Sequence, residues 1–171
     1  MKIAVKDANV FIDMESMGIL DLWFQLGYET LTSDFVVTEL EKGDHQQALS
    51  HVRAGQVGAI SISGEQLPEL YALFAEIEPA GASLEDASVL HIALAHDALL
   101  LTGDKALRTQ SEVRMVECHG TFWILEQLVD EGLLLPQIAA DKLVYLLGLT
   151  GRRKRFLPRA LAESYIQKWR K

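Results

Sequence analysis

Short apolar runs of strand length alternate with longer helical patterns over the first 150 residues, and this alternation restricts the possible folds more than any other feature of the chain. Five runs predict strands, at residues 3–5, 28–31, 57–62, 99–102 and 113–116. The runs show no clear alternation of apolar and polar residues, which is typical of strands buried on both faces. The sequence therefore predicts an α/β protein, a three-layer α/β/α domain with a central, mostly parallel sheet of about five strands.

Helical periodicity fills the segments between these strands. Helices are expected at residues 9–26, 35–43, 44–54, 65–77, 83–97, 105–109, 121–130 and 137–147, with a turn at 79–82. A last amphipathic helix is expected at residues 160–169, after Pro158.

Charge divides the chain near Gly148 to Gly151. Residues 1–150 contain 8 Lys and Arg against 23 Asp and Glu, a net charge of −15, whereas residues 151–171 contain 8 against 1, a net charge of +7. We interpret residues 1–150 as one domain and residues 151–171 as a basic, helical tail. The basic run at 152–155 could contact RNA phosphates, lie on the acidic body or dock a partner. An acidic body repels nucleic acid unless cations or a local basic surface intervene.

The chain shows no sign of secretion or membrane insertion. Cys118 is its single cysteine, so an internal disulfide or a multi-cysteine zinc site is excluded. The first residues are too short and too charged for a signal peptide, and no apolar run approaches the roughly 18–20 residues that a membrane-spanning helix needs. We expect a soluble cytoplasmic protein with no membrane partner.

Two acids follow predicted strands. Asp7 comes directly after the first strand, and Asp104 follows the fourth strand after Thr102 and Gly103. In an open parallel sheet, ligands bind beyond the carboxyl ends of the strands, near the point where the strand order reverses. Both acids could alternatively cap the helices that follow them.

Two further acids lie on predicted helices. Glu39 has apolar neighbours, and Asp86 lies in the first turn of the helix that begins at Ser83, where an apolar stripe meets the edge of the sheet. Glu39 could simply be solvated, and Ser83 with Asp86 fits a capping box. If all four acids meet at one end of the sheet, they repel one another unless they are protonated or hold a cation. A hard, oxygen-binding ion such as Mg²⁺ or Mn²⁺ suits such a site.

Several segments resemble, in the same order, the successive signatures of the PIN domain family. They are residues 7–12 (DANVFI), 37–40 (VTEL), 85–90 (EDASVL) with 92–93 (IA), 100–108 (LLTGDKALR), and 119–121 (HGT) with the following helix up to residue 134. The resemblance spans about residues 1–135.

This resemblance implies a metal-dependent nuclease, usually a ribonuclease, whose best-known bacterial members are VapC-like toxins held inactive by a cognate antitoxin. The residues that it implies for the metal site are Asp7, Glu39, Asp86 and Asp104, with Thr102 orienting the last acid or a metal-bound water. Bound Mg²⁺ or Mn²⁺ would neutralise the scissile phosphate and lower the pKa of the attacking water.

Four positions leave details of the implied site open. Asn9, two residues after the first acid, is a possible supporting polar residue. The third acid of the pattern could be Glu85 or Asp86, and the Ala-Ser-Val-Leu sequence that follows favours Asp86. Gly103 and Arg108 do not supply the extra Asp or Asn that some members have here, so the number of metal ions stays open.

The sequence thus predicts a Mg²⁺- or Mn²⁺-dependent endoribonuclease, the toxin of a VapBC-like toxin–antitoxin pair. The expected partners are an RNA substrate, a cognate antitoxin and a second copy of the chain in a homodimer. The alternative is a PIN-fold scaffold that binds RNA or protein with little or no cleavage.

Overall fold

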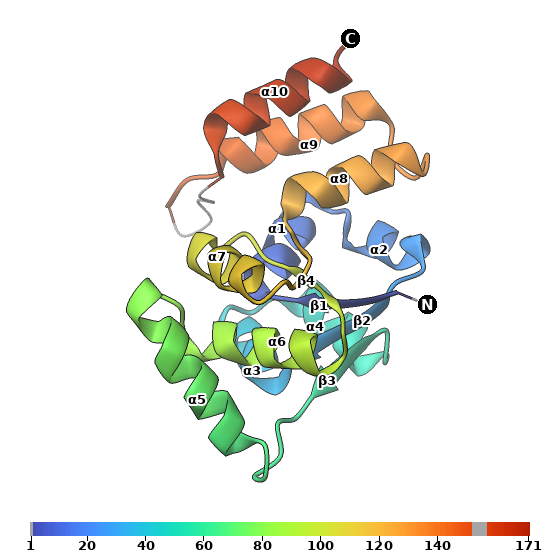
Figure 1. Ribbon diagram of the computed structural model, residues 1–171. Helices are drawn as coiled ribbons and strands as arrows, with labels where there is room; N and C mark the ends of the chain where they lie inside the picture. The colour runs from blue at the N-terminus through green and yellow to red at the C-terminus, as the bar shows by residue number, and fades with distance from the viewer. Residues whose placement is uncertain (1, 152–156) are drawn as a thin grey trace.

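The computed structural model describes residues 2–151 and 157–171 and contains one five-stranded sheet in which every pair of neighbours is parallel (Figure 1). The strands are β1 (Ile3–Lys6), β2 (Glu29–Ser33), β3 (Val57–Ile60), β4 (Leu99–Leu101) and β5 (Cys118–His119). The α/β class and the parallel sheet predicted from the sequence are confirmed.

The order of the strands is β3-β2-β1-β4-β5. The chain runs outward from the central β1 to β3 and then returns to place β4 on the other side of β1, with Val5 opposite both Leu31 and Leu100. The strand order therefore reverses between β1 and β4. In open parallel sheets this reversal leaves a crevice at the carboxyl ends of the two strands.

Helices cover both faces of the sheet. They are α1 (Ala8–Met17), α2 (Leu20–Trp23), α3 (Asp34–Lys42), α4 (Gln46–Arg53), α5 (Leu67–Ile77), α6 (Leu84–Ala95), α7 (Lys105–Val113), α8 (Thr121–Asp130), α9 (Pro136–Gly148) and α10 (Arg159–Trp169). On one side α6 packs across β1, β2 and β4, while α1 and α8 lie on the opposite side (Figure 1). This is the predicted three-layer arrangement.

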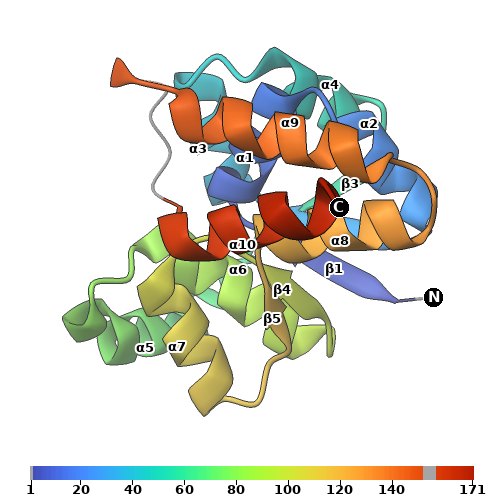
Figure 2. The same cartoon turned by 90° about the horizontal axis from the view of Figure 1, so that it is seen from above.

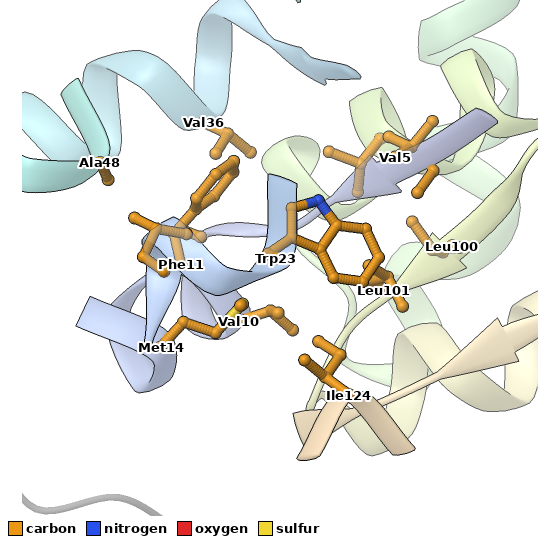
Figure 3. Close-up of a cluster of buried hydrophobic side chains, with 14 of the residues drawn as sticks. Val5, Val10, Phe11, Met14, Trp23, Val36, Ala48, Leu100, Leu101 and Ile124 are labelled. Atoms are coloured by element: carbon orange, nitrogen blue, oxygen red, sulfur yellow. The ribbon is translucent and has the colours of Figure 1, made fainter. Parts of the chain in front are cut away.

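The core beneath α1 is built from side chains of helices and strands that are distant in sequence. In Figure 3, Trp23 of α2 lies beside Leu101 of β4 and Phe11 of α1 lies beside Val36 of α3, and all four side chains are completely buried. Burying side chains of this size contributes about 1.5–3 kcal/mol each. The packing fixes the end of β1, and hence Asp7, relative to β4.

Lys6 is also completely buried, in a box of aromatic and thioether groups. Its Nζ lies 4.0 Å from the centroid of the Trp23 ring and 3.3 Å from Sδ of Met14. Burial lowers the pKa of Lys6 well below its usual range. Burial among these groups, and not a neighbouring charge, is the cause of this lowered pKa.

The single helix predicted at residues 9–26 is wrong. It divides into α1, α2 and a 3₁₀ turn at Phe24–Leu26. Gly18 has a φ of 65°, its N–H donates to the Glu15 carbonyl, and the N–H of Ile19 donates to the Met14 carbonyl. This left-handed cap ends α1, because only glycine adopts the conformation without steric cost.

The predicted strand at residues 113–116 is also wrong. Helix α7 continues to Val113 instead of ending near residue 109, because Leu107 and Ser111 give it a buried face. Met115 follows with a φ of 57° and a side chain that is 94% exposed. The fifth strand begins only at Cys118, which pairs with Leu100.

The helix predicted at residues 160–169 is confirmed as α10, which lies beside α9 (Figure 2). Ala162 and Trp169 are its buried residues, and the Tyr165 ring stacks on Phe122 of α8 at 5.5 Å. The basic run at 152–155 lies outside the described residues, and the division into a domain and a tail stays a prediction. None of the helices described here is long and apolar enough to cross a lipid bilayer.

Candidate functional site

Asp7 lies at the junction of β1 and α1, at the reversal of strand order. Its backbone N–H donates to the Leu101 carbonyl at 3.0 Å, which ties the end of β1 to the end of β4. Its side chain caps α1, because Oδ1 accepts a hydrogen bond from the N–H of Ala8 at 2.7 Å. The capping interpretation of Asp7 is therefore correct for one of its two carboxylate oxygens.

The second oxygen of Asp7 faces two polar side chains. Oδ2 accepts hydrogen bonds from Oγ1 of Thr102 at 2.7 Å and from Nδ2 of Asn9 at 2.6 Å. The same Thr102 hydroxyl accepts from the backbone N–H of Asp104 at 3.0 Å, and Oδ1 of Asn9 accepts from that of Gly103 at 2.8 Å. Thr102 and Asn9 thus join Asp7 to the loop that holds Asp104.

The Asp7 carboxyl is 4% exposed, and its pKa is raised to about 7. Burial is the main cause, followed by the negative charge of Asp86 and, to a smaller extent, that of Glu39. Hydrogen bonds from Thr102 and Ala8 oppose the rise in pKa without offsetting it. The carboxylate of Asp7 is therefore electrostatically unfavourable in the protein without a bound cation.

Asp86 forms the capping box of α6 with Ser83. Its Oδ2 accepts from the N–H and Oγ of Ser83 at 2.7 and 3.0 Å, and its own N–H donates to Oγ of Ser83 at 3.1 Å. Burial nevertheless raises the pKa of Asp86, assisted by the charges of Asp104 and Glu85. The capping box holds Asp86 at the start of α6, within electrostatic range of Asp104.

Asp104 caps α7, as its Oδ1 accepts from the N–H of Leu107 at 2.8 Å. Glu39 lies on α3, and burial together with the charges of Glu85 and Asp86 raises its pKa. Among the neighbouring acids, Glu85 raises the pKa of Glu39 more than Asp86 does. The negative charges of both Glu85 and Asp86 therefore contribute to the electrostatic potential at the site.

The sequence model of a family described as PIN domain matches residues 3–171, nearly the whole chain. The protein belongs to the PIN domain family. A search of curated proteins found no match. PIN domains are commonly nucleases, and the match extends past the resemblance seen in the sequence to include α9 and α10.

The site of this PIN domain links all four predicted acids, although not as a closed cluster. Asp7 interacts electrostatically with Glu39 and Asp86, and Asp86 with Asp104. Thr102 connects Asp7 to Asp104 by hydrogen bonds. Among residues 2–151 and 157–171, no three His, Cys, Asp or Glu side chains are arranged as a ready metal site.

The donor atoms of this PIN domain nevertheless suit a hard divalent ion. All the candidate ligands are carboxylate oxygens, and the pKa values of Asp7, Glu39 and Asp86 are raised. Within the described part of the chain, no group donates a hydrogen bond to the Glu39 carboxylate, to Oδ1 of Asp86 or to Oδ2 of Asp104. Oxygen donors with unfavourable negative charge are the groups that Mg²⁺ and Mn²⁺ bind.

Sequence reasoning missed a pair of buried serines beneath the acids. Oγ of Ser88 on α6 donates to Oγ of Ser33 at 2.7 Å, while Ser33 caps α3 by accepting from the N–H of Val36. Both serines are completely buried, and their contact fixes α6 relative to α3. The signal available for Ser33 was a serine in the short segment between the strand predicted at residues 28–31 and the helix predicted from residue 35, where an N-cap is expected.

Proposed function

We propose that this PIN domain is a divalent-metal-dependent endoribonuclease that hydrolyses phosphodiester bonds of RNA. The observation that carries the proposal is the state of Asp7, whose pKa is raised to about 7 beside the charges of Asp86 and Glu39. None of these three acids forms an ion pair with a described residue. Buried acids that repel one another at a topological switch point are typical of a site that binds a cation.

The groups proposed to hold Mg²⁺ or Mn²⁺ are the carboxylates of Asp7, Glu39, Asp86 and Asp104. When bound, the metal supplies positive charge that neutralises the scissile phosphate and acidifies the attacking water. Thr102 acts on the protein side, because its hydroxyl donates to Asp7 and accepts from the backbone of Asp104. Such supporting hydrogen bonds orient ligands and favour their charged form.

Asn9 is proposed to act in the same way. Its amide nitrogen donates to Asp7 while its oxygen accepts from Gly103, so it holds the two segments at a fixed separation. A side chain at residue 103 would disturb this arrangement, since an added Cβ would lie 3.2 Å from Oδ1 of Asn9. The absence of a side chain at Gly103 lets the loop approach Asn9.

The test is cleavage of a labelled single-stranded RNA by the full chain with Mg²⁺, with Mn²⁺ and with a chelator. We expect cleavage only with metal, loss of cleavage in Asp7→Asn, and a loss of about 10- to 100-fold in Thr102→Val, the size typical of a supporting hydrogen bond. The matched control is Asp97→Asn, which changes an exposed acid just before β4, at the amino end of the strands and away from the candidate site. Full cleavage by Asp7→Asn, or cleavage that survives the chelator, would refute the proposal.

A second function is favoured by the capping interactions. Asp7, Asp86 and Asp104 each accept a hydrogen bond from a backbone N–H at a helix start, so a structural role already accounts for one oxygen of each. This favours the alternative, a PIN-fold scaffold that binds RNA or protein without efficient cleavage. The scaffold would bind RNA with metal present and leave it intact, and Asp7→Asn would bind equally well.

The finer proposal is that the enzyme is the toxin of a VapBC-like pair, with a cognate antitoxin as its protein partner. Support comes from membership of the PIN domain family. Expression in a bacterial host should arrest growth, and Asp7→Asn should relieve the arrest. The neighbouring gene should encode a small DNA-binding protein that forms a complex with this chain and blocks its cleavage of RNA.

A homodimer is also proposed. Helix α9 exposes large apolar side chains, among them Ile138, Val144 and Tyr145, with 41–51% of each accessible. Contiguous exposed apolar residues are typical of protein interfaces. Light scattering should give about twice the mass of the chain, and Tyr145→Lys should shift the protein towards monomer.

A further inference from the structure

A groove of about 550 Å³ begins beside the candidate acid site. Gly103 lies at one end, and the walls come from α7, from the start of α8 and from α10. Helices α7, α8 and α10 surround β5 in the view from above (Figure 2). The volume falls in the range of ligand-binding pockets, about 300–1,000 Å³.

The charge of this groove is opposite to that of the surrounding protein. Its charged lining residues are Lys105 and Arg108, and no described residue that lines it is acidic. This is unusual in a chain with 24 acidic and 16 basic residues. A groove with only positive charges, next to a cluster of acids, favours an anionic ligand that extends from that cluster.

Arg108 is held in a fixed position by the backbone. Its guanidinium donates to the Thr102 carbonyl at 3.1 Å and to the Cys118 carbonyl at 3.4 Å. Gly120 makes room for it, since an added Cβ at that residue would lie 2.9 Å from a guanidinium nitrogen. These bonds use two of the five N–H donors of arginine. The two bonds hold the positively charged guanidinium next to Thr102 and the acid site.

The remainder of the groove is aromatic and apolar. The rings of His119 and Trp123 stack at 4.2 Å with an angle of 8° between their planes, and Nε2 of His119 is 2.8 Å from Oε1 of Glu117. Leu161 and Tyr165 of α10 also line the groove. Planar rings beside fixed cations form the combination that binds single-stranded nucleic acid, because bases stack on the rings while phosphates approach the cations.

We propose that this groove binds an unpaired nucleotide of the RNA next to the scissile phosphate. Its base would stack on the pair formed by His119 and Trp123, and a phosphate would contact Lys105 and Arg108. The inference rests on the proposed function, since it names the part of an RNA substrate that adjoins the acid site. It also predicts a preference for single-stranded over duplex RNA, because a paired base is not available for stacking.

The first test measures binding of a fluorescein-labelled single-stranded RNA decamer to the full chain, with a chelator present to prevent cleavage. Trp123→Leu should weaken binding about tenfold, as expected for loss of one stacking contact. Lys105→Gln should weaken it and reduce the slope of log affinity against log salt by about one. The matched controls are Tyr71→Leu on α5 and Lys142→Gln on α9, which both change residues outside the groove. They should bind like the parent.

Leu replaces the half-buried Trp123 with an apolar side chain, and the melting temperature of every variant checks that it folds. The surface variant Lys105→Gln keeps the test valid if Trp123→Leu is unstable. Equal affinity of the parent and Lys105→Gln at all salt concentrations would overturn the inference. So would equal affinity for the decamer and for its duplex, or no binding of the decamer at all.

A second readout separates this inference from the nuclease proposal. If both hold, Trp123→Leu raises KM for cleavage with a smaller change in kcat, whereas Asp7→Asn abolishes cleavage but still binds the decamer. If cleavage depends on Asp7 and decamer affinity is unchanged in Trp123→Leu and Lys105→Gln, the groove is refuted and the nuclease stands. If the parent binds through Trp123 and Lys105 but does not cleave, the groove stands and the nuclease is refuted.

Discussion

Asp7 shows how burial and neighbouring charges can outweigh hydrogen bonds at a single residue. Its carboxylate accepts hydrogen bonds from Ala8, Asn9 and Thr102, an arrangement that by itself lowers a pKa. Its pKa is nevertheless raised to about 7, because it is buried and shares its field with Asp86 and Glu39. The same residue therefore stabilises the start of α1 and opposes folding through its charge.

The pH dependence of stability follows from this raised pKa. Asp7 has a pKa near 3.8 when unfolded and about 7 when folded, so the folded state binds more protons between these values. Its contribution is complete below about pH 4 and is lost as the pH rises through about 7. In chelator, the free energy of unfolding of the parent should fall by about 4 kcal/mol relative to Asp7→Asn between pH 4 and pH 8.

Urea denaturation at a series of pH values measures this difference. A difference in the free energy of unfolding that does not change with pH reports the cost of placing the amide group of Asp7→Asn against the donors of Asn9 and Thr102. A difference that changes with pH reports the titration of the Asp7 carboxylate. Parallel stability curves from pH 4 to pH 8 would show that Asp7 titrates normally.

The sequence was sufficient to predict some of these residues and not others. Asp7 and Asp104 are found by their position after apolar strands, and this needs only the local pattern. The contact between Ser33 and Ser88 joins residues 55 positions apart and exists because α6 packs across β2. No local pattern encodes that contact.

At the scale of elements, the start of α6 has two roles. Ser83 and Asp86 satisfy backbone N–H groups at the helix terminus, and the same bonds hold Asp86 near Asp104. The hydrogen bonds from Ser83 also oppose the rise in the pKa of Asp86. The capping box is therefore expected to support both the helix and metal binding.

Ser83→Ala tests this dual role. It should cost about 1 kcal/mol of stability, the usual loss for a helix cap. Removing a donor from Asp86 also raises the pKa of that acid further, so calorimetric Mn²⁺ affinity should fall. The control is Ser83→Thr, which keeps a hydroxyl at the N-cap and should resemble the parent in both measurements. A stable Ser83→Ala protein with parental Mn²⁺ affinity would exclude the supporting role.

The errors in element prediction have a common cause. Helical periodicity continues through Gly18, and only the left-handed conformation of that glycine shows where α1 ends. Val113 and Met115 look like strand residues, yet they are 71% and 94% exposed because α7 extends further than its apolar pattern indicates. In both cases the apolar pattern is compatible with two local structures, and a residue with a positive φ, Gly18 or Met115, marks where the structure departs from the predicted one.

At the scale of the whole molecule, the site is a set of like charges delivered by separate parts of the chain. Asp7 follows β1 and Asp104 follows β4, while Glu39 lies on α3 and Asp86 lies in the first turn of α6. A cation bound among them would hold these parts together. Its effect on global stability is therefore a direct measure of whether the acids act as one site.

Thermal melting provides that measure. At a Mg²⁺ or Mn²⁺ concentration 100 times the dissociation constant, binding adds about 2.7 kcal/mol, which is roughly 5–10 °C for a chain of this size. The shift should be larger at pH 8 than at pH 5.5, because protons compete for carboxylates with raised pKa values. Asp7→Asn should show a smaller shift. Equal shifts at both pH values, or in both proteins, would indicate binding elsewhere.

One wall of the groove comes from α10, which the ribosome makes after the four candidate acids and the other lining residues. A nascent chain that has reached residue 130 already contains the strands, the carboxylates and the stacked rings of His119 and Trp123, but not Leu161 or Tyr165. The last lining residues of the groove are thus added late in translation. Incomplete products released by stalled ribosomes would hold RNA more weakly than the longer polypeptide.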